Sequence, residues 1–281
     1  MTAMRTGVGA HYRERSWLER WAAGVRLSRA PHWLRALLKR AMALVVRTMP
    51  GDHLTSRLPG GERVRVDPAY RHLGWNAEEY AAFKGCTRRG ATVLDVGANV
   101  GAYTVLFAQW VGSRGRVYAF EPASASRAGL VRHVAINGLA DRVTVRPEAV
   151  AAATGRQRFV DVATHGDNRL TTASDAGAVD VPVISIDEFC RVANVRLDVI
   201  KIDVEGAELD VLRGARETIA QRGPALSLFV ELHPSAWPAL GITRADVESE
   251  LRRQQLTLEP LPGVADPWTT EGVCVRVRST A

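Results

Sequence analysis

Carboxylate and imidazole side chains lie where two apolar segments of this 281-residue chain end. Asp203 closes the segment 197–203, and Glu231 and His233 end another, 226–232, two residues apart and so on one face of a strand. A carboxylate or an imidazole can take the proton of a hydroxyl group while its oxygen attacks an electrophile. We therefore predict Asp203 as a base or orienting group, with Glu231 and His233 as further catalytic candidates.

These side chains also have structural interpretations. Carboxylates beyond a strand often cap the next helix, which fits Asp203 and fits Glu205 and Glu208 better. Together, Asp203, Glu231 and His233 offer donor types that suit magnesium, manganese or iron. No metal-site spacing such as HExxH accompanies them, so the sequence leaves a divalent metal open but predicts no metal ligands.

A glycine-rich turn follows the first buried segment, 92–96. It has the sequence DVGANVG at 95–101 and leads into a helical segment. Ligands bind at the carboxyl ends of the strands of an open parallel sheet, and glycine lets the backbone approach them closely. The spacing differs from the GxGxxG of dinucleotide-binding turns, and Asp95 repels a pyrophosphate but suits a sulfonium ligand that carries an ammonium group.

Glu121 ends the next predicted strand, 116–121, twenty residues beyond Gly101. A carboxylate at this position can accept hydrogen bonds from two ribose hydroxyl groups. The turn and Glu121 together predict a nucleoside-containing cofactor more specifically than either does alone.

These residues need a sheet that brings the strand ends together. Apolar segments that alternate with helical ones predict a doubly wound, mainly parallel α/β sheet. The expected strands are 92–96, 116–121, 142–145, 197–203 and 226–232, with terminal strands near 256–259 and 272–277. The expected helices are 103–110, 125–137, 186–193, 207–221 and 244–254, and an inserted hairpin is expected at 157–162 and 180–184.

Several of these segments resemble the FkbM family of S-adenosylmethionine-dependent methyltransferases. They read DVGANVGAYT at 95–104, AFEP at 119–122, DVIKIDVEGAE at 198–208 and VLRGA at 211–215. The resemblance covers about residues 75–260. It implies a class I methyltransferase (Rossmann-like) fold, S-adenosyl-L-methionine as cofactor, and methyl transfer to a hydroxyl of a sugar, glycolipid or other small natural product.

The resemblance also assigns cofactor contacts. The turn lines the methionine and ribose portions, Glu121 binds the ribose hydroxyls, and Glu148 and Ala149 contact adenine, although Glu148 equally fits a solvated loop carboxylate. The cofactor-binding residues that we predict are Asp95, Gly97, Asn99, Gly101, Tyr103, Glu121, Glu148 and Ala149.

Positive charge is concentrated at the N-terminus. The chain has a net charge of +7, but residues 1–50 hold ten Lys or Arg and two Glu, so the remaining 231 residues have a net charge of −1. No run of arginines interleaved with aromatic residues occurs in that larger part. This distribution argues against a nucleic-acid partner.

Residues 16–49 have helical apolar spacing with a basic opposite face, and Pro-Gly turns follow at 50–51 and 59–61. We therefore expect a basic amphipathic helical extension at 1–60 and an S-adenosylmethionine-binding domain at 61–281. Packing on that domain or a homodimer contact is the favoured role of the extension, and contact with an anionic membrane surface is the alternative.

Cysteine usage and hydropathy point to the cytoplasm. Cys86, Cys190 and Cys274 are scattered and predict no disulfide framework or zinc site. The sequence has no apolar run long enough for a membrane span and no secretory signal. Three alternatives remain open: methylation of nitrogen, methylation of a peptide or protein, and a non-catalytic scaffold that docks through the basic extension.

Overall fold

The computed structural model describes residues 4–5, 10–12, 53–161, 169–171, 178–263, 266–269 and 273–279. The helices expected within 16–49 lie outside the described residues. Near the N-terminus, two short strands pair with each other. The second of them also pairs with a third strand, which precedes the first described α-helix. They are β1 (Met4–Arg5), β2 (Ala10–Tyr12) and β5 (Trp75–Asn76).

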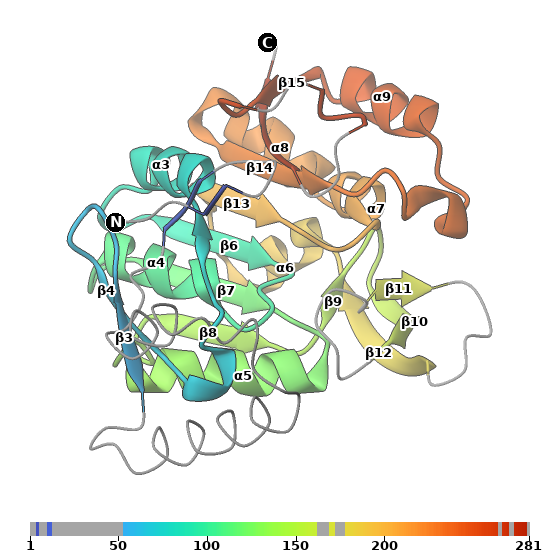
Figure 1. The fold of residues 1–281 in the computed structure, drawn as a ribbon. Coiled ribbons are helices and arrows are strands. Elements are labelled where there is room, and N and C mark those ends of the chain that lie inside the picture. The colour runs from blue at the N-terminus through green and yellow to red at the C-terminus, as the bar shows by residue number, and fades with distance from the viewer. Residues whose placement is uncertain are drawn as a thin grey trace, which may run out of the picture.

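A seven-stranded sheet forms the centre of the molecule, in the order β15-β16-β14-β13-β6-β7-β8 (Figure 1). The last five strands in this order are parallel, and β16 runs antiparallel to both β14 and β15. The mainly parallel, doubly wound sheet expected from the sequence is therefore confirmed. Its strands are β6 (Thr92–Val96), β7 (Arg116–Phe120), β8 (Val143–Arg146), β13 (Val199–Ile202), β14 (Ser227–Leu232), β15 (Leu256–Pro260) and β16 (Val273–Ser279).

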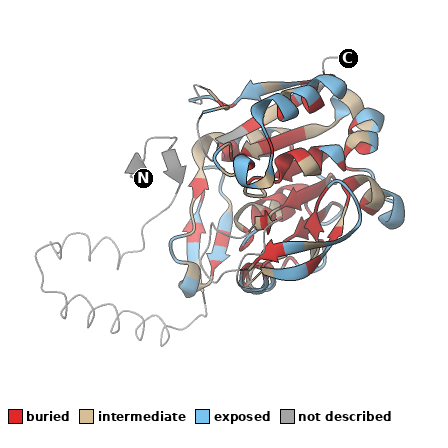
Figure 2. Ribbon diagram, turned by 90° about the vertical axis from the view of Figure 1, so that its right-hand side faces the viewer, coloured by how far each residue is buried: buried red, intermediate tan, exposed pale blue. Residues whose placement is uncertain are grey.

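Helices cover both faces of this sheet because its buried strands direct alternate apolar residues to opposite sides. Val93 packs in one hydrophobic core and the next residue, Leu94, in the other. The first core is covered by α3 (Ala77–Cys86), α4 (Ala102–Val111) and α5 (Ser124–Ile136). The second is covered by α6 (Ile186–Ala193), α7 (Glu208–Arg213), α8 (Arg216–Arg222) and α9 (Arg244–Arg253). Figure 2 shows buried residues concentrated between these layers.

The helix expected at 207–221 is instead two helices, α7 and α8. Between them, Gly214 lies so close to a neighbouring loop that a Cβ atom there would stand 2.2 Å from the carbonyl oxygen of Ala151. This close approach needs glycine, and the chain changes direction there. None of the helices in the described ranges is long and apolar enough to cross a membrane.

A hairpin precedes the sheet and spans the domain boundary expected at residue 60. Its strands are β3 (Leu54–Arg57) and β4 (Arg63–Val66), and it packs on the first core through Leu58, Val64 and Val66. Short 3-10 helices are η2 (Pro68–Tyr70), η3 (Gly223–Ala225) and η4 (Trp237–Leu240).

A second sheet of four strands lies beside the central one, in the order β11-β10-β12-β9 (Figure 1). Its strands are β9 (Ala149–Val150), β10 (Gly155–Val160), β11 (Arg169–Thr171) and β12 (Ala178–Ile184). The antiparallel pairing of β10 with β12 confirms the expected inserted hairpin, and β11 extends it. Phe159 and Leu170 of this sheet pack against Ala123 and Ala149, so the insertion is anchored beside β7 and β8.

Phe83 fixes α3 against the central sheet. It is fully buried, and its ring lies 4.9 Å from Tyr103, 4.8 Å from Phe229 and 5.5 Å from Phe107, measured between centroids. We expect Phe83→Ala to lower the free energy of unfolding by about 3–5 kcal/mol in urea titrations, because the substitution removes these ring contacts and leaves a cavity. Val131→Ala, at a side chain that is 51% exposed, should change it by less than about 0.5 kcal/mol. Equal stabilities of the two variants would contradict this packing role.

Candidate active site

The glycine-rich turn passes between the carboxyl ends of β7 and β13. Gly97 has a φ of +74°, and the amide groups of Gly97 and Ala98 both donate hydrogen bonds to the carbonyl oxygen of Phe120 at 3.0 Å. A Cβ atom on Gly97 would lie 1.6 Å from the carbonyl oxygen of Asp203. Only glycine fits here, because both the positive φ and the close approach exclude a side chain.

Glu121 follows β7 and is 6% exposed. One carboxylate oxygen accepts a hydrogen bond from the amide of Asn99 at 2.7 Å, and the other accepts one from the amide of Ala123 at 2.8 Å. Burial raises the pKa of Glu121 to about 7, although both amide donors oppose this rise. Each oxygen keeps a second acceptor site, so the carboxylate can receive two hydroxyl groups.

A pocket opens beside this turn and encloses about 620 Å³, part of it open to solvent. It is lined by Val96, Gly97, Asn99, Phe120, Glu121, Pro122, Ser126, Glu148, Ala149, Val150, Phe159, Leu170, Asp203, Val204 and Glu205. The lining combines carboxylates with an apolar section, a combination that matches the polar ribose and the flat apolar base of a nucleoside.

Five predicted cofactor residues line this pocket, and three lie outside its lining. The five are Gly97, Asn99, Glu121, Glu148 and Ala149. Of the other three, Gly101 begins α4 with a φ of +88°, and a Cβ atom there would stand 2.5 Å from Leu130. Tyr103 is half-buried and outside the pocket lining, and its hydroxyl accepts a hydrogen bond from the amide of Asn76 at 3.2 Å.

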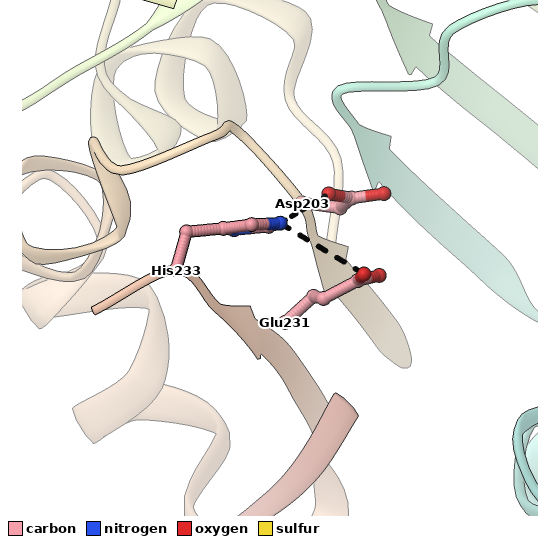
Figure 3. Close-up of side chains that lie close together, drawn as sticks. All are labelled: Asp203, Glu231 and His233. Carbon is pink, nitrogen blue, oxygen red and sulfur yellow. Dashed lines mark ion pairs between the residues drawn. The ribbon is translucent and has the colours of Figure 1, made fainter. Parts of the chain in front are cut away.

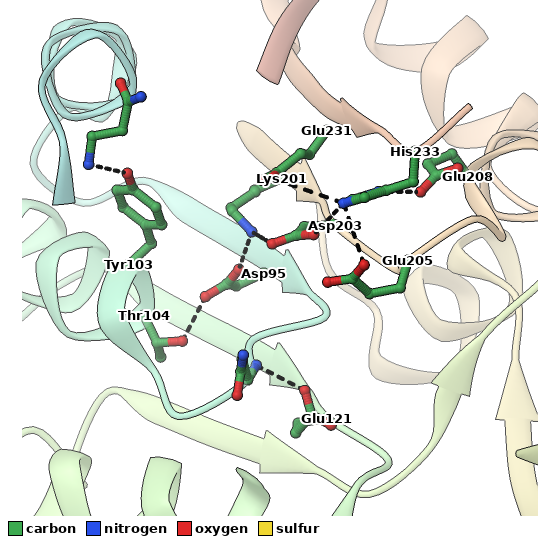
Figure 4. A network of polar contacts seen from close by, with 12 residues as sticks. Asp95, Tyr103, Thr104, Glu121, Lys201, Asp203, Glu205, Glu208, Glu231 and His233 are labelled. Carbon is green, nitrogen blue, oxygen red and sulfur yellow. Dashed lines mark hydrogen bonds and ion pairs between the residues drawn. The ribbon is translucent and has the colours of Figure 1, made fainter. Parts of the chain in front are cut away.

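The third, Asp95, is buried at the end of β6 next to Lys201. Asp95 accepts a hydrogen bond from the hydroxyl of Thr104 at 2.5 Å, and its other oxygen lies 4.0 Å from Lys201 Nζ. Lys201 Nζ also donates to Asp203 Oδ2 at 3.0 Å (Figure 4). Burial lowers the pKa of Lys201, but the carboxylates of Asp203, Asp95 and Glu231 outweigh burial and raise it, so the side chain stays an ammonium ion.

The sequence analysis missed Lys201 and the apolar part of the pocket. Lys201 is 3% exposed within β13, and a signal for it was present as a single cation inside an otherwise apolar strand. Phe159 and Leu170, 4% and 7% exposed, reach the pocket from the inserted sheet. In the sequence, each appears only as an apolar residue on a short strand. Such a pattern indicates that the side chain is buried, but it does not indicate that the side chain contacts a ligand.

The three predicted catalytic side chains converge. One ligand atom each of Asp203, Glu231 and His233 lies within 4.8 Å of the others (Figure 3). His233 Nε2 is 3.9 Å from Asp203 Oδ1 and 3.9 Å from Glu231 Oε1. Because Asp203 also lines the pocket, this group, which we call the Asp203 cluster, directly adjoins the expected cofactor site.

Glu208 sets the orientation of His233. Its carboxylate is fully buried and accepts hydrogen bonds from Trp237 Nε1 and from the amide of Gly206, both at 2.8 Å. His233 Nδ1 lies 2.9 Å from Glu208 Oε1. Since a carboxylate only accepts, Nδ1 carries the hydrogen and Nε2 faces the Asp203 cluster. Glu208 is the first residue of α7, as the sequence indicated, but its side chain makes no capping hydrogen bond to that helix and instead contacts His233 and Trp237.

The surroundings of the Asp203 cluster raise the pKa values of His233 and Glu231. Burial lowers the pKa of His233, but the hydrogen bond and charge of Glu208, together with nearby carboxylates, raise it to about 9. Burial raises the pKa of Glu231 well above its usual value, and the charges of Asp203 and Glu79 raise it further. Both shifts favour the protonated forms of these side chains, which can donate hydrogen bonds to an acceptor molecule.

Comparisons with known proteins identify the type of domain. A family model for the methyltransferase FkbM domain matches residues 95–255, a range that contains the glycine-rich turn, Glu121 and the Asp203 cluster. The AMB antimetabolite synthetase AmbE of Pseudomonas aeruginosa is 29% identical over 201 residues, which cover 58% of this chain and 9% of that protein. The chain thus spans less than a tenth of the length of this relative.

Two solved structures are among those that match this chain. Methyltransferase FkbM from Methylobacillus flagellatus KT has 20% sequence identity and a TM-score of 0.44, over 66% of this chain and 43% of that one. Aeropyrum pernix fibrillarin, which has S-adenosyl-L-methionine bound, has 14% identity and a TM-score of 0.43, over 83% of this chain and 86% of that one.

The raised pKa of Glu121 predicts a pH-dependent effect of Glu121→Gln. The folded protein keeps a proton on Glu121 up to about pH 7, whereas the unfolded chain releases it near pH 4.5, so the stability of the wild type falls as pH rises between these values. Relative to the wild type, the variant should gain about 3 kcal/mol between pH 4 and pH 8. Urea unfolding at both pH values measures this difference; an identical mutational effect at the two would contradict it.

Proposed function

Since the chain belongs to the FkbM methyltransferase family, we propose that it transfers the methyl group of S-adenosyl-L-methionine to a hydroxyl oxygen of a sugar, glycolipid or secondary metabolite. The observation that carries this proposal is the convergence of Asp203, Glu231 and His233 beside the pocket, with Asp203 part of both sites. Groups that bind and deprotonate a hydroxyl thus adjoin the place of the methyl donor.

The pocket fits this cofactor. The two free acceptor sites of Glu121 suit the ribose hydroxyls, and the apolar section around Phe159 and Leu170 suits the adenine ring. Carboxylates of Asp203 and Glu205 at the other side of the pocket suit a positively charged donor. When bound, the cofactor supplies a methyl group activated by a sulfonium centre.

Residues of the Asp203 cluster account for the acceptor side. A hydroxyl group is barely acidic, so its oxygen needs a base or an orienting group as it attacks in line. Asp203 serves this role: Lys201 holds one of its oxygens, and the other faces His233. Glu231 and His233 position the oxygens of the acceptor beside Asp203. Asp203, Glu231 and His233 are therefore the proposed catalytic residues.

The acceptor class has separate support. The relative AmbE is named an antimetabolite synthetase, and this name favours a secondary metabolite as the acceptor. A site with several carboxylates and an imidazole also suits an acceptor with more than one hydroxyl group. The name therefore favours a secondary metabolite, and the side chains of the site favour one with several hydroxyl groups.

Asp203→Asn separates cofactor binding from methyl transfer. We expect turnover to fall by about 100-fold or more, because the base or orienting carboxylate is lost, while the Kd of S-adenosylhomocysteine changes less than about threefold. Calorimetric titration measures the Kd, and mass spectrometry of a panel of hydroxylated and amine acceptors measures turnover.

The same measurements can also contradict the proposal. Wild-type turnover in Asp203→Asn would remove Asp203 from the mechanism, and methylation of amines alone would replace the hydroxyl acceptor. Failure of the folded wild-type protein to bind S-adenosylhomocysteine would overturn the proposal as a whole. Glu217→Gln, an exposed position on α8, is the matched control and should behave like the wild type.

A further inference from the structure

Hydrogen bonds do not explain why the Asp203 cluster converges. The separations of 3.9 Å from His233 Nε2 to Asp203 and to Glu231 exceed hydrogen-bond length. Within the described part of the chain, the Glu231 carboxylate makes no hydrogen bond, although its side chain is only 19% exposed. A divalent ion between the two carboxylates would offset their repulsion, in addition to the ammonium group of Lys201 that lies 3.0 Å from Asp203.

The ring of His233 is oriented in the way that is common for metal-binding histidines. The residue is 8% exposed, and its Nδ1 is fixed by a carboxylate that is itself fixed by two further donors. A metal-binding histidine commonly donates its other ring N–H to a carboxylate in this way, and the contact aims the free nitrogen at the ion. His233 Nε2 makes no hydrogen bond among the described residues, and it faces three carboxylates, of which Glu205 is the nearest at 3.4 Å.

The spacing and the donor types suit a divalent ion. With metal–ligand distances of about 2.1 Å, ligand atoms stand about 3 Å apart when adjacent and about 4.2 Å apart when opposite. The 3.9 Å separations fall within this range. One imidazole nitrogen with carboxylate oxygens and no thiolate favours an ion such as Mn²⁺ or Fe²⁺.

We propose that Asp203, Glu231 and His233 bind a divalent metal ion at the carboxyl edge of β13 and β14. Asp203 contributes Oδ1, since Oδ2 is held by Lys201, and in this site it acts as the orienting group. The role of the ion rests on the proposed function: it binds the acceptor hydroxyl and lowers the pKa of that group. The metal site itself is independent of the methyl donor.

Binding of Mn²⁺ to the full chain tests the site directly. The electron paramagnetic resonance signal of free Mn²⁺ falls as the ion binds, and we expect saturation at one ion per chain. Glu231→Gln and His233→Asn should each weaken binding at least tenfold, while the matched control Glu217→Gln leaves it unchanged. Circular dichroism and the Kd of S-adenosylhomocysteine show whether each variant is folded, and Glu231→Gln, which keeps the shape of the side chain, preserves the test if His233→Asn unfolds.

The outcomes separate the two proposals. The metal site is overturned if the protein does not bind Mn²⁺, or if the wild type and both variants bind it equally. Protons shared among the side chains would then account for their close approach. If S-adenosylhomocysteine still binds in that case, the proposed function stands. A protein that binds Mn²⁺ in the predicted manner but not S-adenosylhomocysteine keeps the metal site and loses the proposed function.

Discussion

The buried ammonium group of Lys201 holds the acidic edge of the sheet together. It stands between Asp95 and Asp203, which end neighbouring parallel strands. Without this cation, two largely buried carboxylates would face each other with no compensating charge, at a cost of several kcal/mol. Because Asp95 also accepts the hydroxyl of Thr104, the same ion links β6 and β13 to α4 and so fixes the first turn of the site.

Two functions meet at the end of β13. In the proposed function, the glycine-rich turn and Glu121 bind the methyl donor on one side, and Glu231 and His233 bind the acceptor on the other. Asp203 belongs to both, and its backbone lies so close to Gly97 that a side chain on the turn would collide with the strand end. The described strands of the inserted sheet line the pocket through Phe159 and Leu170 and contribute no residue to the cluster.

Strand ends were predictable because alternating apolar and helical segments determine a parallel sheet, and a parallel sheet brings its carboxyl ends to one edge. That logic placed Glu121, Asp203 and Glu231 correctly at this edge. It could not show that Gly101 packs against Leu130, that the hydroxyl of Tyr103 bonds to the backbone of Asn76, or that a close approach at Gly214 divides a helix. These features depend on contacts between segments that are distant in sequence.

The insertion illustrates the same limit. Its hairpin could be predicted from two short apolar strands, but the contribution of Phe159 and Leu170 to the pocket depends on how the second sheet packs beside β7 and β8. Likewise, the orientation of His233 by Glu208 joins a strand end to the start of α7, and no local pattern carries that information.

The most direct test of the central claim is a crystal structure of the protein with S-adenosylhomocysteine. The account predicts the ribose hydroxyls on Glu121, the adenine between Phe159 and Leu170, and the sulfur atom facing the Asp203 cluster. A ligand in another pocket, or a sulfur atom turned away from Asp203, would contradict the account.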